Sequence, residues 1–162
     1  MTSGLFKENV ESVEGHCVIT TDVVDVLRQI IADLGAQRVA VSDAPELAGF
    51  GIVPGANDLF DFEVGITKAQ AAIAETGTLV LDSSCERNRL VSVVPPVHIA
   101  IVAASRIYPT LADVLAMLQS GKELSPAITF ITGPSRTADI ELTLTIGVHG
   151  PKELYVIIDE SA

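Results

Sequence analysis

Short apolar runs near the start of the chain flank one longer stretch in which apolar residues recur at helical spacing. Residues 16–20 and 38–42 predict two strands, because each is a short, mainly apolar run bounded by glycine or polar residues. The stretch between them predicts a helix, which Thr21 or Asp22 would cap and Gly35 would end. A strand, a helix and a strand in this order favour a parallel crossover unit.

The middle of the chain has a less regular pattern. Prolines and glycines interrupt residues 45–65, which we expect to be irregular. The alanine-rich segment 68–76 favours a helix, and residues 78–82 favour a strand. Two further strands, residues 90–94 and 98–105, are separated by consecutive prolines, since proline cannot donate to a strand ladder.

The last third of the chain predicts one more helix and two more strands. Thr110 and Asp113 have the spacing of a capping box ahead of a helix, and residues 127–131 and 153–159 favour strands. Residues 139–146 alternate polar and apolar as a half-exposed strand would, yet they follow a turn of the kind that often opens a helix. Their secondary structure is left open.

The composition supports an α/β fold. Hydrophobic residues make up 48% of the 162 residues but aromatic residues only 4%, so the core must consist mainly of valine, isoleucine, leucine and alanine. Such a core is typical of buried parallel strands with helices against them. We therefore predict one α/β domain over residues 1–162, with a largely parallel sheet flanked by helices.

Charge limits the partners of the chain. The net charge is −11, which would repel phosphate backbones, so nucleic acid is not expected to bind. The charge is uneven: residues 1–82 contain four basic and 13 acidic residues, whereas residues 83–152 contain six basic and five acidic. We expect a small anion to bind in the second part.

The cysteine pattern argues against a metal centre. Cys17 and Cys85 are the only cysteines and form no C-x-x-C pair, so neither a disulfide framework nor a thiolate-held cluster is indicated.

The N-terminal sequence lacks a secretion signal pattern, and the most apolar segment, residues 94–105, is broken by prolines and a histidine well short of a membrane span. We expect a cytoplasmic protein with no membrane span.

The stretch ITGPSRTADIE, residues 131–141, combines a turn with hydroxyl side chains and one arginine. A strand that ends at a turn around Gly133 leaves backbone N–H groups unpaired, and such groups can bind an anion. We expect this turn to lie at the carboxyl edge of the sheet, where α/β proteins bind ligands. Arg136 could add a planar, bidentate donor for a carboxylate or phosphate. The alternative is an ordinary turn.

In that alternative, the polar residues of the stretch stabilise the fold. Ser135 or Thr137 would cap the element that follows, and Arg136 would pair with Asp139 or Glu141. The residues themselves do not decide between a cap and an anion site.

The stretch AETGT, residues 74–78, is a second candidate. Glu75 lies directly before Thr76, Gly77 and Thr78, at the junction with a strand. A carboxylate in such a position can act as a nucleophile or general base if its environment raises its pKa. The alternative is a solvated glutamate.

The histidines give a weaker signal. His98 and His149 could form an acid–base pair, or could bind a metal with Asp139 and Glu141, but no H-x-H or H-x-x-x-H spacing is present. His98 starts an apolar strand, where histidine is usually a core residue. Cys85 has arginines nearby in sequence but no visible base, and we expect an incidental thiol.

Four motifs in the same order, IAETGTLVL, RLVSVVPPVHIAIV, GPSRTADIE and GVHGPKELYVII, closely resemble the LUD-domain family of LutC/YkgG-type lactate utilisation proteins. The resemblance runs from about residue 58 to residue 159. It implies a fold similar to that of ribose-5-phosphate isomerase, glucosamine-6-phosphate deaminase and class I coenzyme A transferases (the NagB/RpiA/CoA-transferase-like fold). In such transferases a nucleophilic glutamate precedes a glycine, which singles out Glu75, although fold alone does not fix chemistry.

The resemblance also implies a function. It indicates a LutC-like subunit of a cytoplasmic system that oxidises L-lactate to pyruvate, with no cofactor of its own and with iron–sulfur clusters on LutA/LutB-like partner subunits. The alternatives are a free-standing enzyme acting on a small phosphorylated or CoA-thioester substrate, and a non-catalytic ligand-binding regulator. The candidate catalytic residues are Glu75 and His149, and no metal site is expected. The residues expected to bind a small carboxylate or phosphate are Thr76, Gly77, Thr78, Gly133, Ser135, Arg136, Thr137 and Asp139.

Overall fold

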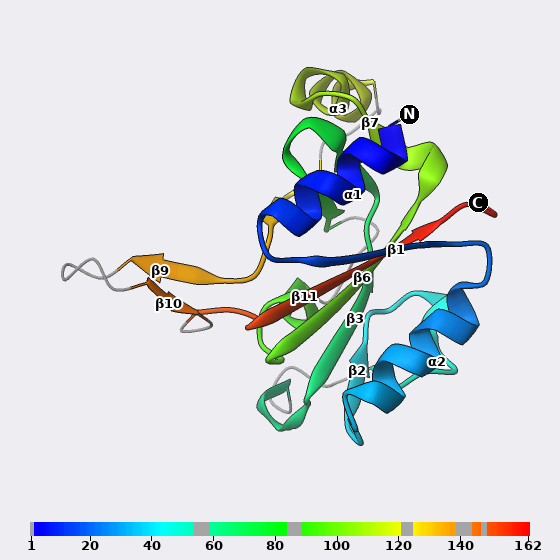
Figure 1. The fold of residues 1–162 in the computed structure, drawn as a ribbon, viewed down its shortest axis with the longest axis vertical. Helices are drawn as coiled ribbons and strands as arrows, with labels where there is room; N and C mark the ends of the chain where they lie inside the picture. Colours follow the sequence, from blue (N-terminus) through cyan, green and yellow to red (C-terminus); the bar gives the residue numbers. More distant parts are fainter. Residues whose placement is uncertain (1, 54–58, 84–88, 121–124, 139–143, 147–148) are drawn as a thin grey trace.

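A five-stranded parallel sheet forms the centre of the protein (Figure 1). The structure is a computed structural model that describes residues 2–53, 59–83, 89–120, 125–138, 144–146 and 149–162. In spatial order the strands are β1 (His16–Thr20), β11 (Glu153–Asp159), β6 (Val97–Ala103), β3 (Val64–Lys68) and β2 (Val39–Val41). The predicted crossover is confirmed, with β1 and β2 at opposite edges of the sheet.

The two faces of this sheet pack against different layers. In the central strand β6, Ala100 and Val102 face the core cluster on the first side of the sheet. Ile99 and Ile101 face a different core cluster on the second side. Alternation along each strand therefore gives apolar side chains to both sides, as expected for a sheet that is covered on both faces. Helix α2 (Val23–Asp33) covers the second face, and Asp22 caps it by accepting a hydrogen bond from the N–H of Asp25.

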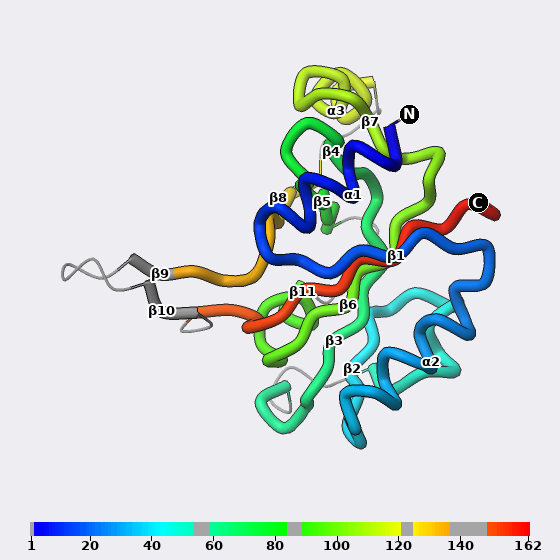
Figure 2. The backbone as a smooth tube through the Cα atoms, viewed as in Figure 1, coloured from blue at the N-terminus to red at the C-terminus, as the bar shows by residue number. Residues whose placement is uncertain are grey.

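A smaller sheet packs against the first face. Its order is β7 (Ile107–Tyr108), β4 (Ala71–Ile73), β5 (Thr78–Asp82) and β8 (Ile128–Thr132), with β5 antiparallel to both of its neighbours. Figure 2 shows this sheet beside helix α1 (Thr2–Ser12), which inserts Phe6 and Val10 into the shared core. Helix α3 (Leu111–Gln119) packs on the same sheet through Val114, and the predicted capping box of Thr110 and Asp113 is present.

Two short strands form a ribbon that extends from the body of the molecule. β9 (Arg136–Ala138) pairs antiparallel with β10 (Leu144–Ile146), and Figure 1 shows them projecting on the side where β11 begins. Residues 144–146 of the segment left open above are therefore a strand, and residues 139–143 lie outside the described residues. No helix in the described part of the chain is long and apolar enough to cross a membrane.

Two predicted elements are wrong. The segment 68–76 is not a helix: it holds the end of β3, the strand β4 and the short 3₁₀ helix η3 (Ala74–Thr76). The segment 90–94 is not a strand, because the 3₁₀ helix η4 (Arg89–Ser92) occupies most of it. The N–H of Val94 donates a hydrogen bond to the carbonyl of Leu90 at 2.9 Å, so the chain turns here. Within the range 45–65 the structure describes residues 45–53 and 59–65, which are irregular as predicted, apart from 3₁₀ turns and the start of β3. These turns are η1 (Pro45–Leu47) and η2 (Leu59–Asp61).

Candidate functional site

Helix α1 packs directly on the glycine of the AETGT stretch. Gly77 has a left-handed backbone, with φ of 64°, and a Cβ atom built on it would lie 2.6 Å from backbone atoms of Asn9 and Val10. The side-chain amide of Asn9 also donates to the carbonyl of Ala74 at 2.8 Å. The close backbone approach at Gly77 is therefore made by α1, and only glycine leaves room for it.

Glu75 joins η3 to the start of α3. Its Oε1 atom accepts a hydrogen bond from the N–H of Leu111 at 2.8 Å, and its own N–H donates to the carbonyl of Pro109 at 3.1 Å. The side chain is exposed. Because the first N–H groups of a helix lack partners within the helix, this carboxylate acts as an additional cap on α3.

A row of hydroxyl groups connects the two predicted stretches. The hydroxyl oxygens of Thr76 and Thr78 lie 2.7 Å apart, and those of Thr78 and Thr132 also lie 2.7 Å apart. The register of β5 and β8 places Thr78 opposite Thr132. The structure thus brings AETGT next to the strand that leads into the GPSRT turn.

The GPSRT turn packs against the connection between α1 and β1. Gly133 has φ of 72°, and a Cβ atom there would lie 2.7 Å from the carbonyl oxygen of Val13. The N–H of Ser135 donates to the carbonyl of Pro151 at 2.9 Å. The connection beyond α1 therefore covers Gly133 closely, just as α1 itself covers Gly77.

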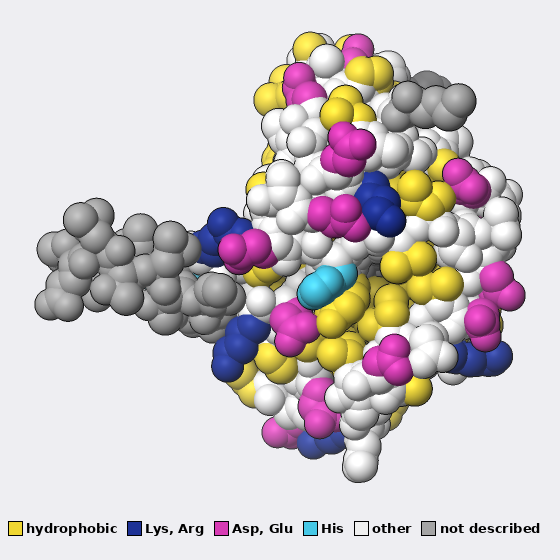
Figure 3. Space-filling model, viewed as in Figure 1, with side chains coloured by type: hydrophobic (Ala, Val, Ile, Leu, Met, Phe, Trp, Pro, Cys, Tyr) yellow, Lys and Arg dark blue, Asp and Glu magenta, His cyan; other side chains and the backbone are white. Residues whose placement is uncertain are grey.

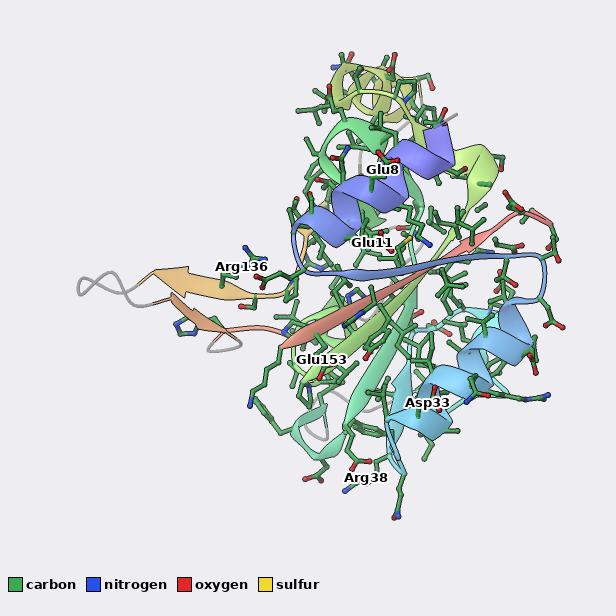
Figure 4. The ribbon with its side chains drawn as sticks, viewed as in Figure 1. Glu8, Glu11, Asp33, Arg38, Arg136 and Glu153 are labelled. Atoms are coloured by element: carbon green, nitrogen blue, oxygen red, sulfur yellow. The ribbon has the colours of Figure 1, made fainter. Side chains whose placement is uncertain are left out.

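Arg136 reaches the same connection. Its Nη2 atom donates to the carbonyl of Val13 at 2.7 Å and lies 3.1 Å from the Oε2 atom of Glu14. Figure 4 shows Arg136 at the base of the β9–β10 ribbon, on the side where α1 turns into β1. The partner is thus a residue that the sequence did not suggest, and the proposed partners Asp139 and Glu141 lie outside the described residues.

The expected position of this turn is wrong. It was predicted at the carboxyl edge of the main sheet, but β8 belongs to the smaller sheet, where its neighbour β5 runs antiparallel to it. The turn instead lies near the segment that leads into β11, as the contact between Ser135 and Pro151 shows.

A cavity lies at the carboxyl edge of the parallel sheet. Its volume is about 620 Å³, and it adjoins the carboxyl ends of β2, β3 and β6. Met117 and Leu118 of α3 contribute an apolar part to its wall. The charged and amide side chains on its wall are those of Asp43, Glu46, Lys68, Gln70, Asp82 and Arg106.

Polar contacts fix part of the cavity wall. Lys68 pairs with Glu46, and this hydrogen bond lowers the pKa of the Glu46 carboxyl. The amide of Gln70 donates to the carbonyl of Lys68 at 2.9 Å and accepts from the N–H of Asp82. Arg106, in the 3₁₀ helix η5 (Ala104–Arg106), has no hydrogen-bond or ion-pair partner among the residues that the structure describes.

The two histidines occupy different environments. His98 is fully buried, its Nε2 atom lies 2.8 Å from the hydroxyl of Thr67, and its Nδ1 atom has no partner within the described residues. Burial lowers the pKa of His98 to about 3, so the ring is neutral. His149 is exposed. His98 is therefore a core residue, in line with the usual role of a histidine in an apolar strand.

No metal site is found in the described part of the chain, where no group of three or more histidine, cysteine, aspartate or glutamate side chains could hold an ion. Cys17 is buried, and desolvation raises the pKa of its thiol to about 12, which makes it a poor metal ligand and nucleophile. Cys85 lies outside the described residues, as does Asp139, and the side chain of Thr137 lies outside the description as well.

Comparison with known proteins identifies the family. The family model described as the LUD domain matches residues 55–158. A protein named Lactate utilization protein C from Macrococcus caseolyticus is 34% identical over 161 residues, which covers 87% of this chain and 70% of that protein. The chain belongs to the LUD-domain family.

One further sequence relative and one solved structure are similar to this LUD-domain protein. A second Lactate utilization protein C, from Geobacillus sp., is 31% identical over 184 residues, covering 95% of this chain and 76% of that protein. A crystal structure of a DUF162 family protein from Deinococcus radiodurans superposes with a TM-score of 0.70 at 25% identity, covering 97% of this chain and 95% of the other. The predicted single α/β domain with a mostly parallel sheet is confirmed.

Some residues of the candidate site lie within the span matched by the family model, and others precede it. Glu75, Arg136, Lys68 and Arg106 lie within residues 55–158 of the LUD domain. The α1 and α1–β1 residues that contact Gly77, Gly133 and Arg136 precede the matched span, as do the cavity residues Asp43 and Glu46.

Proposed function

We propose that this LUD-domain protein acts in lactate utilisation, as a subunit of a cytoplasmic system that oxidises L-lactate to pyruvate. The observation that carries this proposal is the similarity to several proteins named Lactate utilization protein C, which extends over most of the chain at 31–34% identity. The relatives come from different bacterial genera and align with the region that holds both predicted stretches.

Oxidation of L-lactate releases two electrons, which need an acceptor. The sequence contains only two cysteines, Cys17 and Cys85, whereas an iron–sulfur cluster normally needs four cysteine ligands. Cys17 is buried with a raised pKa. We therefore assign the iron–sulfur clusters to partner subunits of the LutA/LutB type, and give this chain a role in binding those partners and a small carboxylate.

The GPSRT turn supports carboxylate binding by this subunit. Within the described residues, Arg136 makes both of its side-chain contacts through Nη2, and a guanidinium has five N–H donors, so its other nitrogens can bind a carboxylate or phosphate. The hydroxyls of Thr76, Thr78 and Thr132 lie in the neighbouring strands and turn. These groups form the proposed anion site.

Complementation tests the role in lactate utilisation. In a bacterium that carries a Lactate utilization protein C, deletion of its gene should slow growth on L-lactate, and expression of this chain should restore growth. Growth on glucose is the control, since it should be the same in all strains. Failure of a well-expressed chain to restore growth on L-lactate would contradict the proposal.

Co-purification tests the proposed partners. The chain should be tagged and expressed with the neighbouring genes, and the purified material analysed for iron, sulfide and lactate oxidation. We expect iron–sulfur subunits to be recovered with the tagged chain. Recovery of the chain alone, together with lactate oxidation by the other subunits without it, would overturn the subunit assignment, and turnover by the isolated chain would favour a free-standing enzyme.

A further inference from the structure

We propose that the cavity at the carboxyl ends of β2, β3 and β6 binds an organic anion that carries several hydroxyl groups, and that Arg106 binds its anionic group. This site is separate from the GPSRT turn, which lies by the segment leading into β11. Its ligand is also different from the lactate of the proposed function. The inference rests on the position, the size and the side chains of the cavity.

The position and size both indicate a ligand site. In α/β proteins with an open parallel sheet, ligands bind outside the carboxyl ends of the strands, which is where this cavity lies. Its volume of about 620 Å³ is in the range of pockets that hold a complete small-molecule ligand of drug size. A three-carbon acid would fill only a small part of this space, so the ligand is larger than lactate.

Arg106 is the cation available for the anionic group. Lys68 is already paired with Glu46, whereas the guanidinium of Arg106 makes no contact of this kind within the described residues. Arg106 is exposed at the cavity wall, where it can reach a ligand without breaking a bond in the protein. A guanidinium presents parallel N–H donors that match the oxygens of a carboxylate or phosphate.

The acidic side chains explain why the ligand carries hydroxyl groups. Asp43, Glu46 and Asp82 line the same cavity and come from three different elements or their ends. An ionised carboxylate only accepts hydrogen bonds and has about four acceptor positions, so contacts within the protein do not exhaust it. A bare anion would be repelled here, and an apolar ligand would desolvate the carboxylates without compensation. Hydroxyls distributed along a ligand provide donors to all three.

Gln70 keeps this wall in place. Its amide connects the end of β3 to the end of β5, because it donates to the carbonyl of Lys68 and accepts from the N–H of Asp82. Polar groups held in fixed positions lose little conformational entropy when a ligand binds. The polar side of the cavity is thus organised before binding, and Met117 and Leu118 add an apolar part to the wall.

Calorimetric titration of the complete chain tests the proposal with five probes. D-gluconate and D-glucose 6-phosphate combine hydroxyls with a carboxylate or a phosphate. D-glucose has hydroxyls without charge, inorganic phosphate has charge without a carbon chain, and L-lactate is short. We expect D-gluconate or D-glucose 6-phosphate to bind at least about tenfold more tightly than the other three, and the better of the two identifies the anionic group. Binding of neither, or equal binding of L-lactate or phosphate, would overturn the proposal.

Two variants locate the binding. Arg106→Gln should lower the affinity for the more tightly bound probe by about ten- to hundredfold, as expected for the loss of a charge-assisted pair. Arg28→Gln is the matched control, because Arg28 is an exposed arginine on α2 that also has no partner within the described residues. It should leave affinity unchanged. Wild-type affinity in Arg106→Gln, or an equal loss in both variants, would contradict the assignment of Arg106.

Discussion

The guanidinium of Arg136 contacts the connection between α1 and β1 through one nitrogen, Nη2, which meets Val13 and Glu14. The Arg136 side chain keeps 36% of its surface exposed. This geometry is compatible with a second task, because the remaining N–H donors can bind an anion. A structural role and a binding role predict different behaviour of a variant that lacks the side chain.

We expect Arg136→Ala to weaken carboxylate or phosphate binding by about ten- to hundredfold, because it removes a charge-assisted pair of about 1.5–3 kcal/mol. The unfolding free energy should fall by about 1 kcal/mol or less, since partly exposed ion pairs contribute little. Calorimetric titration with L-lactate and with phosphate measures the first effect. Thermal unfolding without ligand measures the second.

Glu14→Gln is the control for this pair of measurements. It removes the ion pair with Arg136 but retains the guanidinium, so affinity should be close to that of the wild type. If Arg136→Ala binds as tightly as the wild type but melts much earlier, Arg136 is a structural contact of the α1–β1 connection, and the stretch is an ordinary turn.

Single residues show where sequence reasoning stops. Arg136 and Glu75 stand out because turn residues and hydroxyls adjoin them in sequence. Their partners cannot be recognised in this way, because they are distant in sequence. Arg136 and the carbonyl of Val13 are 123 residues apart, and Glu75 and the N–H of Leu111 are 36 residues apart. Local pattern can mark a polar side chain, but only the assembled elements show which backbone groups it meets.

Among the elements, the first turn of α3 depends on Glu75. The carboxylate accepts from the N–H of Leu111, next to the capping box of Thr110 and Asp113. We expect Glu75→Gln to have nearly wild-type stability, because its amide oxygen can still accept this bond. Glu75→Ala should lose about 0.5–2 kcal/mol of unfolding free energy, as for the loss of a cap. Denaturation by urea measures both, and equal stability of the two variants would exclude a capping role.

Glycine substitutions can measure how tightly α1 packs on η3. Gly77 and Gly35 have nearly the same left-handed backbone, with φ of 64° and 63°. A Cβ atom on Gly77 would lie 2.6 Å from the backbone of Asn9 and Val10, whereas nothing lies within 4 Å of one on Gly35. Gly35→Ala therefore reports the backbone cost alone, and Gly77→Ala reports that cost plus the contact with α1.

We expect Gly35→Ala to lower the unfolding free energy by about 1–2 kcal/mol, the usual penalty for a left-handed alanine. Gly77→Ala should cost clearly more, and hydrogen exchange should show reduced protection of residues 2–12, because α1 must move away. Urea denaturation and hydrogen exchange by mass spectrometry are the measurements. Similar losses in the two variants, with α1 still protected, would show that the packing tolerates the extra methyl group.

Elements with a clear local signal were predictable. Strands β5 and β11 match their predicted ranges, and α2 and α3 have the predicted caps at Asp22 and Thr110. Helix α1 was not predicted, because it buries only Phe6 and Val10 and so shows little periodicity. Its contacts with Gly77 depend on tertiary packing, which the sequence does not reveal.

The two wrong elements have identifiable physical causes. In segment 68–76, residues 71–74 are buried, with Ala72 and Ala74 in the core shared with the parallel sheet and Ala71 and Ile73 against α3. This packing on both faces outweighs the high intrinsic helix propensity of alanine. In segment 90–94, Val91 and Ser92 are buried in a turn, and the following prolines prevent the chain from running straight into β6. Small residues and valines fit these places because of shape rather than local propensity.

At the scale of the whole molecule, the cavity could not have been predicted. Its polar residues extend from Asp43 to Arg106 in sequence and come together because β2, β3 and β6 end at one edge, beside the end of β5 from the smaller sheet. Lys68 was also assigned to a helix that does not exist. The surface charge, by contrast, follows from the composition. Figure 3 shows acidic side chains spread over the face that carries α1 and α2, in keeping with a net charge of −11.

The stability of the whole molecule should depend on the neutral state of His98. Burial lowers its pKa from 6.5 to about 3. Above pH 6.5 neither the folded nor the unfolded state is protonated at this residue, so no stability is lost. Between pH 6.5 and about 3 only the unfolded state binds a proton, and the unfolding free energy falls by up to about 1.4 kcal/mol per pH unit.

We therefore expect His98→Gln to be less stable than the wild type at pH 7.5 but to lose less stability on acidification. Glutamine can still hydrogen-bond to the hydroxyl of Thr67 but does not titrate. His149→Gln, at an exposed position, is the control for replacing a histidine by glutamine. Urea denaturation at pH 7.5, 6 and 5 gives the three slopes, and protonation of the carboxylates contributes similarly to each. Parallel curves for His98→Gln and the wild type would mean that His98 already accepts a proton in the folded protein, and that its buried site is open to water.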